Sequence, residues 1–333
     1  DLRVEEADIP TIGAGDLLVA VAACGVCGSD IPRMNVNGAY RHPLICGHEF
    51  SGHVVALADD VTDFSVGDLV SVPPLLPCRH CESCLEGHFS LCEDYDYFGS
   101  RRDGAYAQYV AVPADNALLM PEGLDPRAAA MIDPSAIAYH ALLRTQVGEG
   151  SRVAVIGAGP IGLFAVQWAR ILGATEVLAV DLNEQKAAMA VEAGATHTAN
   201  NDDEAKAHAG AGYDVVIESA GVPPTIALAV GLVARRGSAA FIGIPNATVE
   251  LDKKTFSHFL RNEVSLHGSW NSFSAPFPGR EWTESAEKLA SGELRWEFMI
   301  THELGLDALP ATMKQLFERS IFSSKVLFLP NAE

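Results

Sequence analysis

The stretch RVAVIGAGPIGLFAVQWARILGATEVLAVD, residues 152–181, decides the fold class of the second half of the chain. It consists of an apolar run, a glycine-rich turn, a helix-period pattern and a second apolar run. Similar strand and helix patterns alternate from there to about Gly268. Alternation of this kind predicts βαβ crossovers, and therefore an α/β domain in which helices cover both faces of a doubly wound parallel sheet.

The turn in this stretch has the spacing of a dinucleotide-binding loop, with a strand before it and a helix after it. Its glycines would permit a tight turn, the approach of backbone to a pyrophosphate, and close packing of helix on strand. Asp181 ends the second strand, where a carboxylate accepts hydrogen bonds from ribose hydroxyls and repels a 2′-phosphate. We therefore expect NAD rather than NADP, bound by Gly157, Gly159, Pro160, Ile161, Gly162 and Asp181. The alternatives are a glycine-rich turn of another α/β fold and a flavin site.

Four cysteines lie close together in CRHCESCLEGHFSLC, residues 78–92. Thiolates at this spacing close tight loops around one ion, and four of them satisfy tetrahedral zinc without an open position. The metal would then supply folding energy that a lobe of this size cannot obtain from apolar burial. The alternatives are disulfides and packed thiols. We predict a structural zinc site formed by Cys78, Cys81, Cys84 and Cys92.

The regions on either side of the α/β segment have the pattern of β structure. Residues 15–75 alternate apolar and polar positions in short runs, and the tail ends in the apolar run KVLFLP. We expect residues 1–136 and 273–333 to form one β-rich domain, with the cysteine lobe at 77–98. Residues 137–272 would form the nucleotide-binding domain.

The composition excludes several classes of function. The chain has 333 residues and a formal net charge of −20, and a field of that sign repels phosphate backbones, so a nucleic-acid partner is not expected. No apolar run has the length of a membrane span, and the opening DLRVEEADIP does not have the features of a targeting sequence. We expect a cytoplasmic protein whose seven cysteines are thiols or metal ligands.

Three further segments carry metal-ligand residue types next to glycine or proline. Cys27 lies in ACGVCGSD, His48 and Glu49 lie in ICGHEF, and Asp133 lies in MIDPS. Two of them also have another interpretation: Cys27 as one half of a redox pair with Cys24, and Asp133 as a helix cap. The residues alone leave these alternatives open.

The order of these motifs resembles that of the zinc-containing medium-chain dehydrogenases, and the resemblance covers essentially the whole chain. It rests on CGSD, GHEF, the four-cysteine lobe, the acidic residue before a proline, and GAGPIG. The resemblance implies a GroES-like β-rich catalytic domain, a Rossmann domain, and two zinc ions per chain, one catalytic and one structural. It also implies a strand upstream of Asp1.

The resemblance further implies roles for five residues. Cys27 and His48 match the two zinc ligands common to the family, and Asp133 matches the position of the third ligand, usually Glu or Cys. Glu49 matches an acidic residue that binds or approaches zinc in the polyol branch. The sequence leaves open whether Glu49 or Asp133 binds directly. Ser29 matches the hydroxyl residue that relays the substrate proton.

Other stretches resemble the branch of the family that contains polyol and galactitol-1-phosphate dehydrogenases. They are CGSDIPR, VPPLLPC, YDYFGSRRDG and GSWNSFSAPFPGREW. The expected reaction is hydride transfer from a secondary hydroxyl of a polyol or polyol phosphate to NAD. Arg33, Arg101 and Arg102 would bind the phosphate, or else pair with neighbouring carboxylates as surface structure.

Two other functions remain as alternatives. One is a dehydrogenase of unphosphorylated polyols or simple secondary alcohols. The other is a nucleotide-binding family member without catalysis, which disagrees with the presence of Cys27, His48 and Ser29. The resemblance also implies a homodimer or homotetramer.

Overall fold

The computed structural model describes residues 2–331, so the outermost ends of the expected β-rich domain, residues 1 and 332–333, lie outside it. The chain folds into two units. Unit 1 comprises Asp1–Asp133, Phe273–Gly292 and Ile300–Glu333, and unit 2 comprises Pro134–Ser272 and Glu293–Met299. These bounds differ from the expected ones at residues 134–136 and 293–299, which are expected in the β-rich domain and belong to unit 2.

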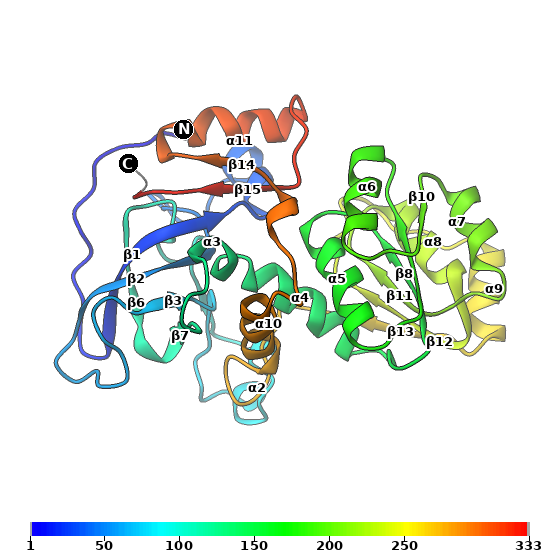
Figure 1. Cartoon of the computed structure of the whole chain (residues 1–333), viewed down its shortest axis with the longest axis horizontal. Coiled ribbons are helices and arrows are strands. Elements are labelled where there is room, and N and C mark those ends of the chain that lie inside the picture. Colours follow the sequence, from blue (N-terminus) through cyan, green and yellow to red (C-terminus); the bar gives the residue numbers. More distant parts are fainter. Residues whose placement is uncertain (1, 332–333) are drawn as a thin grey trace. The chain divides into compact units, whose positions relative to one another are not determined.

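Unit 2 is a doubly wound α/β domain, which confirms the fold class expected for this part of the chain. Its six strands are parallel and lie in the order β10-β9-β8-β11-β12-β13. Figure 1 draws this sheet in the green to yellow part of the chain. They are β8 (Arg152–Ile156), β9 (Glu176–Val180), β10 (His197–Ala199), β11 (Tyr213–Glu218), β12 (Val233–Phe241) and β13 (Ser265–Gly268). The strand order reverses between β8 and β11, and ligands of such sheets bind at the carboxyl ends of the strands at this point.

Helices connect these strands. They are α5 (Pro160–Ile171), α6 (Glu184–Glu192), α7 (Asp202–Ala209), α8 (Pro223–Leu232) and α9 (Lys253–Arg261), with η4 (Glu297–Met299) returning from the tail. The helix α4 (Ile132–Leu143) leads into the unit from Asp133. Strands β8 and β9 are buried along most of their length, as expected for a parallel sheet covered on both faces.

Unit 1 is built on a seven-stranded sheet in the order β14-β15-β1-β2-β3-β7, with β6 also pairing β1. Its strands are β1 (Asp16–Gly25), β2 (Glu49–Leu57), β3 (Leu69–Ser71), β6 (Tyr109–Pro113), β7 (Leu118–Leu119), β14 (Ile300–Leu304) and β15 (Lys325–Phe328). The C-terminal strand β15 pairs antiparallel with β1, with Cys24 opposite Phe328. The tail therefore returns to the domain in which the chain begins, as expected.

The remaining elements of unit 1 are short. They are α1 (Asp30–Pro32), η1 (Arg33–Asn37), α2 (Glu82–Leu85), η2 (Phe89–Leu91), η3 (Ala114–Asn116), α3 (Pro126–Ala129), η5 (Leu306–Ala308), and the hairpin of β4 (Leu75–Leu76) and β5 (Asp96–Tyr97). Two longer helices, α10 (Arg280–Ser291) and α11 (Leu309–Glu318), come from the C-terminal part of the chain.

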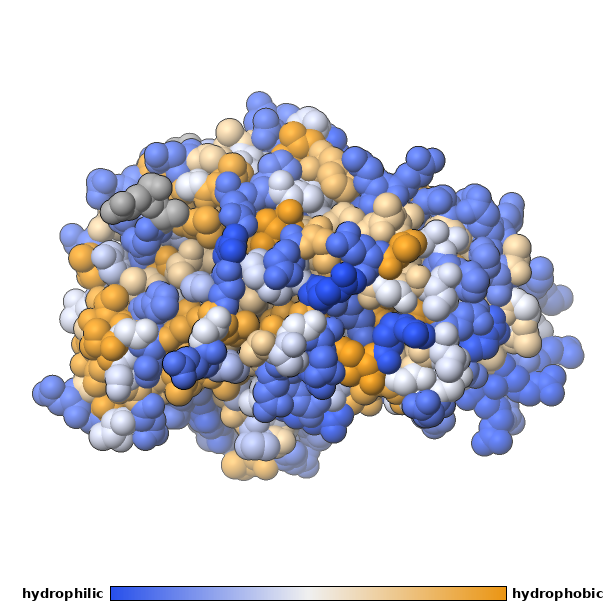
Figure 2. Space-filling model, in the orientation of Figure 1, coloured by the Kyte–Doolittle hydropathy of each residue, from blue (hydrophilic) through white to orange (hydrophobic). Residues whose placement is uncertain are grey.

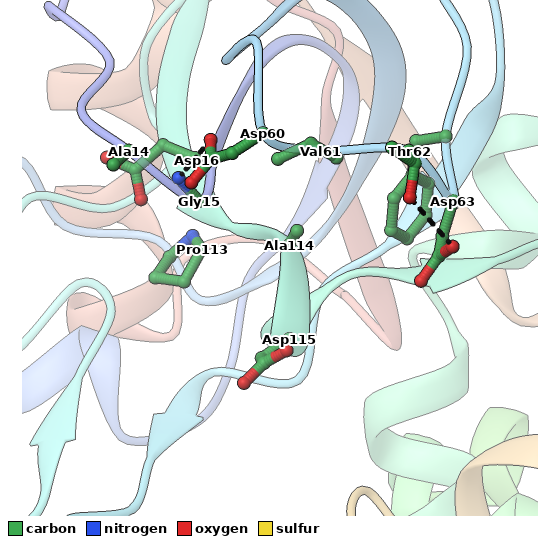
Figure 3. A pocket seen from close by; sticks show the side chains of 11 residues that line it. Ala14, Gly15, Asp16, Asp60, Val61, Thr62, Asp63, Pro113, Ala114 and Asp115 are labelled. Carbon is green, nitrogen blue, oxygen red and sulfur yellow. Dashed lines mark hydrogen bonds between the residues drawn. The ribbon is translucent and has the colours of Figure 1, made fainter.

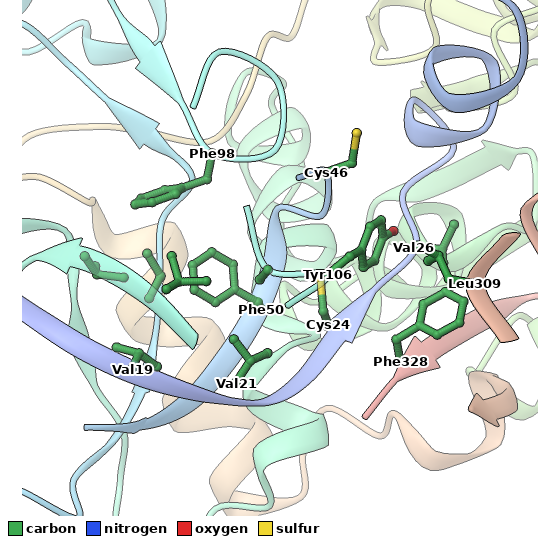
Figure 4. Close-up of a cluster of buried hydrophobic side chains, with 14 of the residues drawn as sticks. Val19, Val21, Cys24, Val26, Cys46, Phe50, Phe98, Tyr106, Leu309 and Phe328 are labelled. Atoms are coloured by element: carbon green, nitrogen blue, oxygen red, sulfur yellow. The ribbon is translucent and has the colours of Figure 1, made fainter. Parts of the chain in front are cut away.

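The core of unit 1 follows from the two-residue period of β1. Leu17, Val19 and Val21 are fully buried and point to one face of the sheet. Figure 4 shows Val19 and Val21 beside Phe50, with Tyr106 and Phe328 further along the cluster. The apolar layer thus extends to the end of β1, where the chain leaves the sheet toward Cys27.

On the face shown in Figure 2, hydrophilic residues predominate and hydrophobic residues are interspersed among them. Within residues 2–331, no helix combines the length and the apolar character needed to cross a bilayer.

Candidate active site

The pairing of β1 with β2 brings three candidate metal ligands together. Gly25, at the end of β1, lies opposite Glu49, at the start of β2, so the loop carrying Cys27 faces the segment carrying His48. The ligand atoms of Cys27, His48 and Glu49 lie within 4.8 Å of one another. His48 and Glu49 are buried, and Cys27 is partly exposed. A thiol, an imidazole and a carboxylate at this separation form a donor set suited to zinc.

Asp133 lies near this cluster but outside the group of three. It is 3% exposed at the start of α4, and its Oδ2 has no hydrogen-bond partner among the described residues. Burial, together with the charge of Glu49, raises the pKa of Asp133 to about 7. A buried carboxylate oxygen without a partner is costly in an apolar interior, and a cation beside it removes that cost. The residues present therefore fit a metal ion.

Glu49 has a partner that the sequence analysis missed. Lys325, on β15, is 1% exposed; its ammonium group pairs with the Glu49 carboxylate and donates to the Val26 carbonyl at 3.2 Å. A Cβ atom on Gly25 would lie 2.5 Å from Glu49 Oε2 and 2.7 Å from Lys325 Cε, so the pair requires glycine at that position. The Glu49 carboxylate is thus paired with a cation, whereas Asp133 Oδ2 has no hydrogen-bond partner in the described part of the chain.

A second carboxylate, also missed from the sequence, supports His48. Asp30 is fully buried, and its Oδ1 lies 3.4 Å from His48 Nδ1. Its Oδ2 accepts hydrogen bonds from the Tyr106 hydroxyl at 2.9 Å and from the Cys27 amide at 3.3 Å. Burial acts to raise the pKa of Asp30, but His48 and these donors outweigh it, and the net pKa is lowered. Carboxylates in this position fix the tautomer and orientation of metal-binding histidines.

Ser29 and Arg33 line a cavity of about 260 Å³ next to Cys27. The Ser29 hydroxyl lies 3.3 Å from Cys27 Sγ. Arg33 Nε is buried without a hydrogen-bond partner among the described residues, and its guanidinium lies 5.4 Å from the ring centroid of Tyr40. The guanidinium of Arg101 also lies over the Tyr40 ring, 5.0 Å from its centroid, and lies 4.1 Å from the ring centroid of Tyr95. The structure therefore brings two of the three predicted arginines to the same aromatic side chain.

The third arginine has a different environment. Arg102 pairs with Asp96 at 2.8 Å and lies over the ring of Phe98 at 5.5 Å. These contacts correspond to the alternative in which Arg102 pairs with a neighbouring carboxylate as part of the surface structure.

Another cavity of unit 1, of about 410 Å³, lies elsewhere and is shown in Figure 3. It is lined by Asp16, Asp60, Asp63 and Asp115 together with apolar and backbone groups. None of the predicted site residues contributes to it.

The four cysteines of the lobe converge as predicted, with their sulfur atoms within 4.8 Å of one another. All seven cysteines of the chain are free, which excludes the disulfide alternative. The backbone amide of Cys78 donates to Cys92 Sγ at 3.2 Å, and that of Cys81 donates to Cys78 Sγ at 3.4 Å. Backbone amides also lower the pKa of Cys81 to about 6. Such donors stabilise thiolates, the form that binds metal.

The glycine-rich turn has the backbone geometry expected of a nucleotide-binding loop. Gly157 has a φ of +95°, and a Cβ atom on Gly162 would lie 1.8 Å from the Gly157 carbonyl oxygen. Gly159, by contrast, faces open space, and α5 starts at Pro160 without a side-chain cap. Asp181 accepts hydrogen bonds from the amides of Ala158 and Asn183, each at 2.9 Å. The carboxylate thus lies at the carboxyl end of β9 and is fixed against the loop.

Comparisons with known proteins agree with this arrangement. Residues 13–122 match the family described as "Alcohol dehydrogenase GroES-like domain", and residues 160–291 match "Zinc-binding dehydrogenase". The chain is 37% identical to the galactitol 1-phosphate 5-dehydrogenase of Escherichia coli (strain K12), over 99% of this chain and 97% of that protein. It is 31% identical to the sorbitol dehydrogenase of Bacillus subtilis (strain 168), over 99% and 95% of the two chains.

Solved structures give the same result. The crystal structure of galactitol-1-phosphate dehydrogenase from Escherichia coli matches with a TM-score of 0.94 and 36% identity, covering 98% of this chain and 96% of that one. A putative zinc-binding dehydrogenase from Sinorhizobium meliloti, bound to NADP, matches with a TM-score of 0.90 and 33% identity, covering 97% and 94%. The chain belongs to the zinc-binding alcohol dehydrogenase family, and it is a zinc- and nicotinamide-dependent dehydrogenase.

Four residues next to the predicted ligands were missed from the sequence: Asp30, Tyr97, Tyr106 and Lys325. Tyr97 packs edge-on against His48, with ring centroids 5.7 Å apart. A signal existed for Lys325, because it is the single charge at the start of an otherwise apolar strand. The two tyrosines and Asp30 have no such signal, since their partners lie far away in the sequence or are backbone groups.

We predict that Lys325→Met destabilises the metal-free protein by about 3–5 kcal/mol, because it leaves the Glu49 carboxylate buried and unpaired. The double variant Lys325→Met, Glu49→Gln removes the orphaned charge and should recover most of this loss. Chemical denaturation in the presence of a chelator measures both values. Equal stabilities of the single and double variants would contradict the prediction.

Proposed function

We propose that this enzyme oxidises a secondary hydroxyl of a polyol that carries a terminal phosphate, with NAD as the hydride acceptor. The observation that carries the proposal is the pair of guanidinium groups on Tyr40, beside the cavity that Ser29 lines. In a protein of net charge −20, a dianionic substrate needs such a local concentration of positive charge. The similarity to galactitol 1-phosphate 5-dehydrogenase supports the same substrate class.

Two zinc sites per chain belong to the proposal. The structural site is formed by Cys78, Cys81, Cys84 and Cys92, whose sulfur atoms converge. The catalytic site is formed by Cys27, His48 and Asp133. We assign Asp133 rather than Glu49 as the third ligand, because Glu49 is already paired with Lys325 while Asp133 Oδ2 has no partner in the described part of the chain.

The residues of the catalytic site divide the chemistry between them. Cys27, His48 and Asp133 would hold a zinc ion, which would withdraw electron density from the substrate hydroxyl and lower its pKa. Ser29 Oγ, 3.3 Å from Cys27 Sγ, would accept the proton of that hydroxyl while passing its own proton on toward solvent. Arg33 and Arg101 bind the phosphate and so fix which carbon is presented for oxidation. The amides at the start of α5 bind the pyrophosphate of NAD, and Asp181 binds its ribose.

We expect Arg33→Met to lower kcat/KM for galactitol 1-phosphate by about 100-fold, which corresponds to about 2.7 kcal/mol of lost transition-state binding. The value for galactitol should change by less than about threefold, because that substrate lacks the phosphate. Arg102→Met should leave the preference for the phosphate ester unchanged, since Arg102 is paired with Asp96. NADH formation measures all of these values.

Equal kcat/KM values of the wild-type enzyme for galactitol and for galactitol 1-phosphate would contradict the proposal that Arg33 and Arg101 bind the phosphate. The arginines would then be structural, and the function would be that of a dehydrogenase of unphosphorylated polyols. The similarity to sorbitol dehydrogenase favours this second candidate.

The cofactor preference depends on Asp181. A carboxylate held at the end of β9 repels the 2′-phosphate of NADP, so we expect kcat/KM for NAD to exceed that for NADP by about 100-fold or more. Asp181→Ser should narrow this ratio to below about tenfold. Steady-state kinetics with both cofactors provide the test, and comparable use of NADP by the wild type would exclude the assignment.

We also propose that the protein is a homo-oligomer in which the free edge of β13 is covered by a second copy. Strand β13 pairs with β12 on one side only, and Ile244, Phe256, Leu260, Leu266 and Trp270 in the same unit are exposed hydrophobic residues. Edges of this kind associate readily when they are not protected by charge.

Light scattering should give the mass of a dimer or tetramer for the wild type and a smaller mass for Leu266→Lys. Val191→Lys, on α6 of the same unit and 57% exposed, serves as a matched control and should leave the mass unchanged. A monomeric wild type would exclude this interface.

A further inference from the structure

Tyr106 has a buried hydroxyl group, which is connected through Asp30 to Cys27 and His48. Tyr106 is 7% exposed, and its ring packs edge-on against Phe328 with centroids 5.5 Å apart. Figure 4 shows the ring within the hydrophobic cluster, next to Cys24 and Phe328, with the hydroxyl oxygen at its far end. A hydroxyl in such surroundings is costly to bury unless it makes a hydrogen bond.

The partner of this hydroxyl is the supporting carboxylate of the proposed metal site. The Tyr106 hydroxyl donates to Asp30 Oδ2 at 2.9 Å, and the Gly25 carbonyl oxygen lies 3.3 Å from the Tyr106 hydroxyl oxygen. A hydroxyl has a single proton to donate, and the shorter, charge-assisted contact is the stronger of the two. Asp30 is fully buried, so its orientation depends on the few donors that surround it.

Asp30 in turn connects two of the proposed ligands. Its Oδ2 accepts from the backbone amide of Cys27 at 3.3 Å, and its Oδ1 lies 3.4 Å from His48 Nδ1. With Nδ1 facing Asp30, the other ring nitrogen of His48 is the one left for a metal. A rotation of the Asp30 carboxylate would release the His48 ring and loosen the Cys27 loop at the same time.

The backbone of Tyr106 is fixed to the segment that precedes His48. Its amide donates to the Cys46 carbonyl at 2.9 Å, and the Ala105 amide donates to the Gly47 carbonyl at 2.9 Å. A Cβ atom on Gly47 would lie 2.8 Å from the Tyr106 nitrogen and 2.9 Å from its Cδ1. The Tyr106 ring is therefore held against the loop that carries His48, and its hydroxyl has little freedom to move.

We propose that Tyr106 is a positioning residue for the catalytic metal: its hydroxyl fixes the Asp30 carboxylate against His48 and the Cys27 loop. This inference rests on the metal site of the proposed function. Outer carboxylates of metal-binding histidines contribute about 10- to 100-fold in metal affinity, and the Tyr106 hydroxyl controls such a group.

The test measures zinc binding by Tyr106→Phe, a variant that keeps the ring and removes only the hydroxyl. Competition with a chromophoric chelator gives the affinity of each zinc site. The variant Cys27→Ala lacks a ligand of the proposed catalytic site, so the zinc ion that it still binds identifies the four-cysteine site. We expect Tyr106→Phe to lower the affinity of the other site by about tenfold or more and to leave the four-cysteine site unchanged. Cobalt substitution should also show a changed visible spectrum at the affected site.

Tyr109→Phe is the matched control, because Tyr109 lies three residues further along, on β6, and is only partly buried. Asp30→Asn changes the acceptor of the same hydrogen bond and should give a similar loss of zinc affinity. In that background, adding Tyr106→Phe should have little further effect, since the hydroxyl acts through Asp30. Additive losses in the double variant would show that Tyr106 acts by another route and would overturn the inference.

The remaining outcomes separate the two levels of the proposal. If the wild type binds two zinc ions and Tyr106→Phe binds both with unchanged affinity, the role of Tyr106 is wrong and the metal site stands. If the wild type and Cys27→Ala both bind only one zinc ion, the proposed catalytic metal site is itself wrong. Should Tyr106→Phe fail to fold, the affinity and cobalt spectrum of Asp30→Asn decide the inference on their own.

Discussion

The buried ion pair between Lys325 and Glu49 is the interaction on which the catalytic unit depends most. It joins β15 at the end of the chain to β2 near its beginning, across the strand β1 that lies between them in the sheet. Both side chains are almost fully buried, and removal of either partner leaves an isolated charge in the interior. The C-terminal return of the chain to unit 1 is thus a requirement of the site as well as of the sheet.

The charges around Cys27 explain why this location suits a divalent cation. Asp30, Glu49 and Asp133 are buried carboxylates within one region, and Lys325 compensates only one of them. The raised pKa of Asp133, caused by burial and by Glu49, reflects the excess of negative charge. A zinc ion bound as proposed would relieve that repulsion and would also satisfy the oxygen of Asp133 that has no partner in the described residues. Metal binding and folding of this region would then be coupled.

The parts that were predictable from the sequence are those with a local pattern. The α/β alternation, the glycine-rich turn and the four-cysteine lobe each lie within short segments whose spacing carries the geometry, and the structure has all three. The choice between Glu49 and Asp133 was not predictable, because it depends on Lys325, which is 276 residues away from Glu49. Tyr106 was missed for the same reason, since nothing near it in the sequence indicates a contact with Asp30.

The three arginines that the sequence offers as phosphate-binding candidates have different surroundings in the structure. Arg101 and Arg102 are neighbours of the same type, yet Arg102 is paired with a carboxylate while Arg101 lies between two aromatic rings. A guanidinium on an aromatic face keeps its N–H groups available around its edge, and Arg33 shares the Tyr40 ring. Two such groups on one ring can bind a dianion without first breaking a salt bridge. In the proposed function, the phosphate would anchor the polyol, and the distance from the phosphate to the metal would select the hydroxyl that is oxidised.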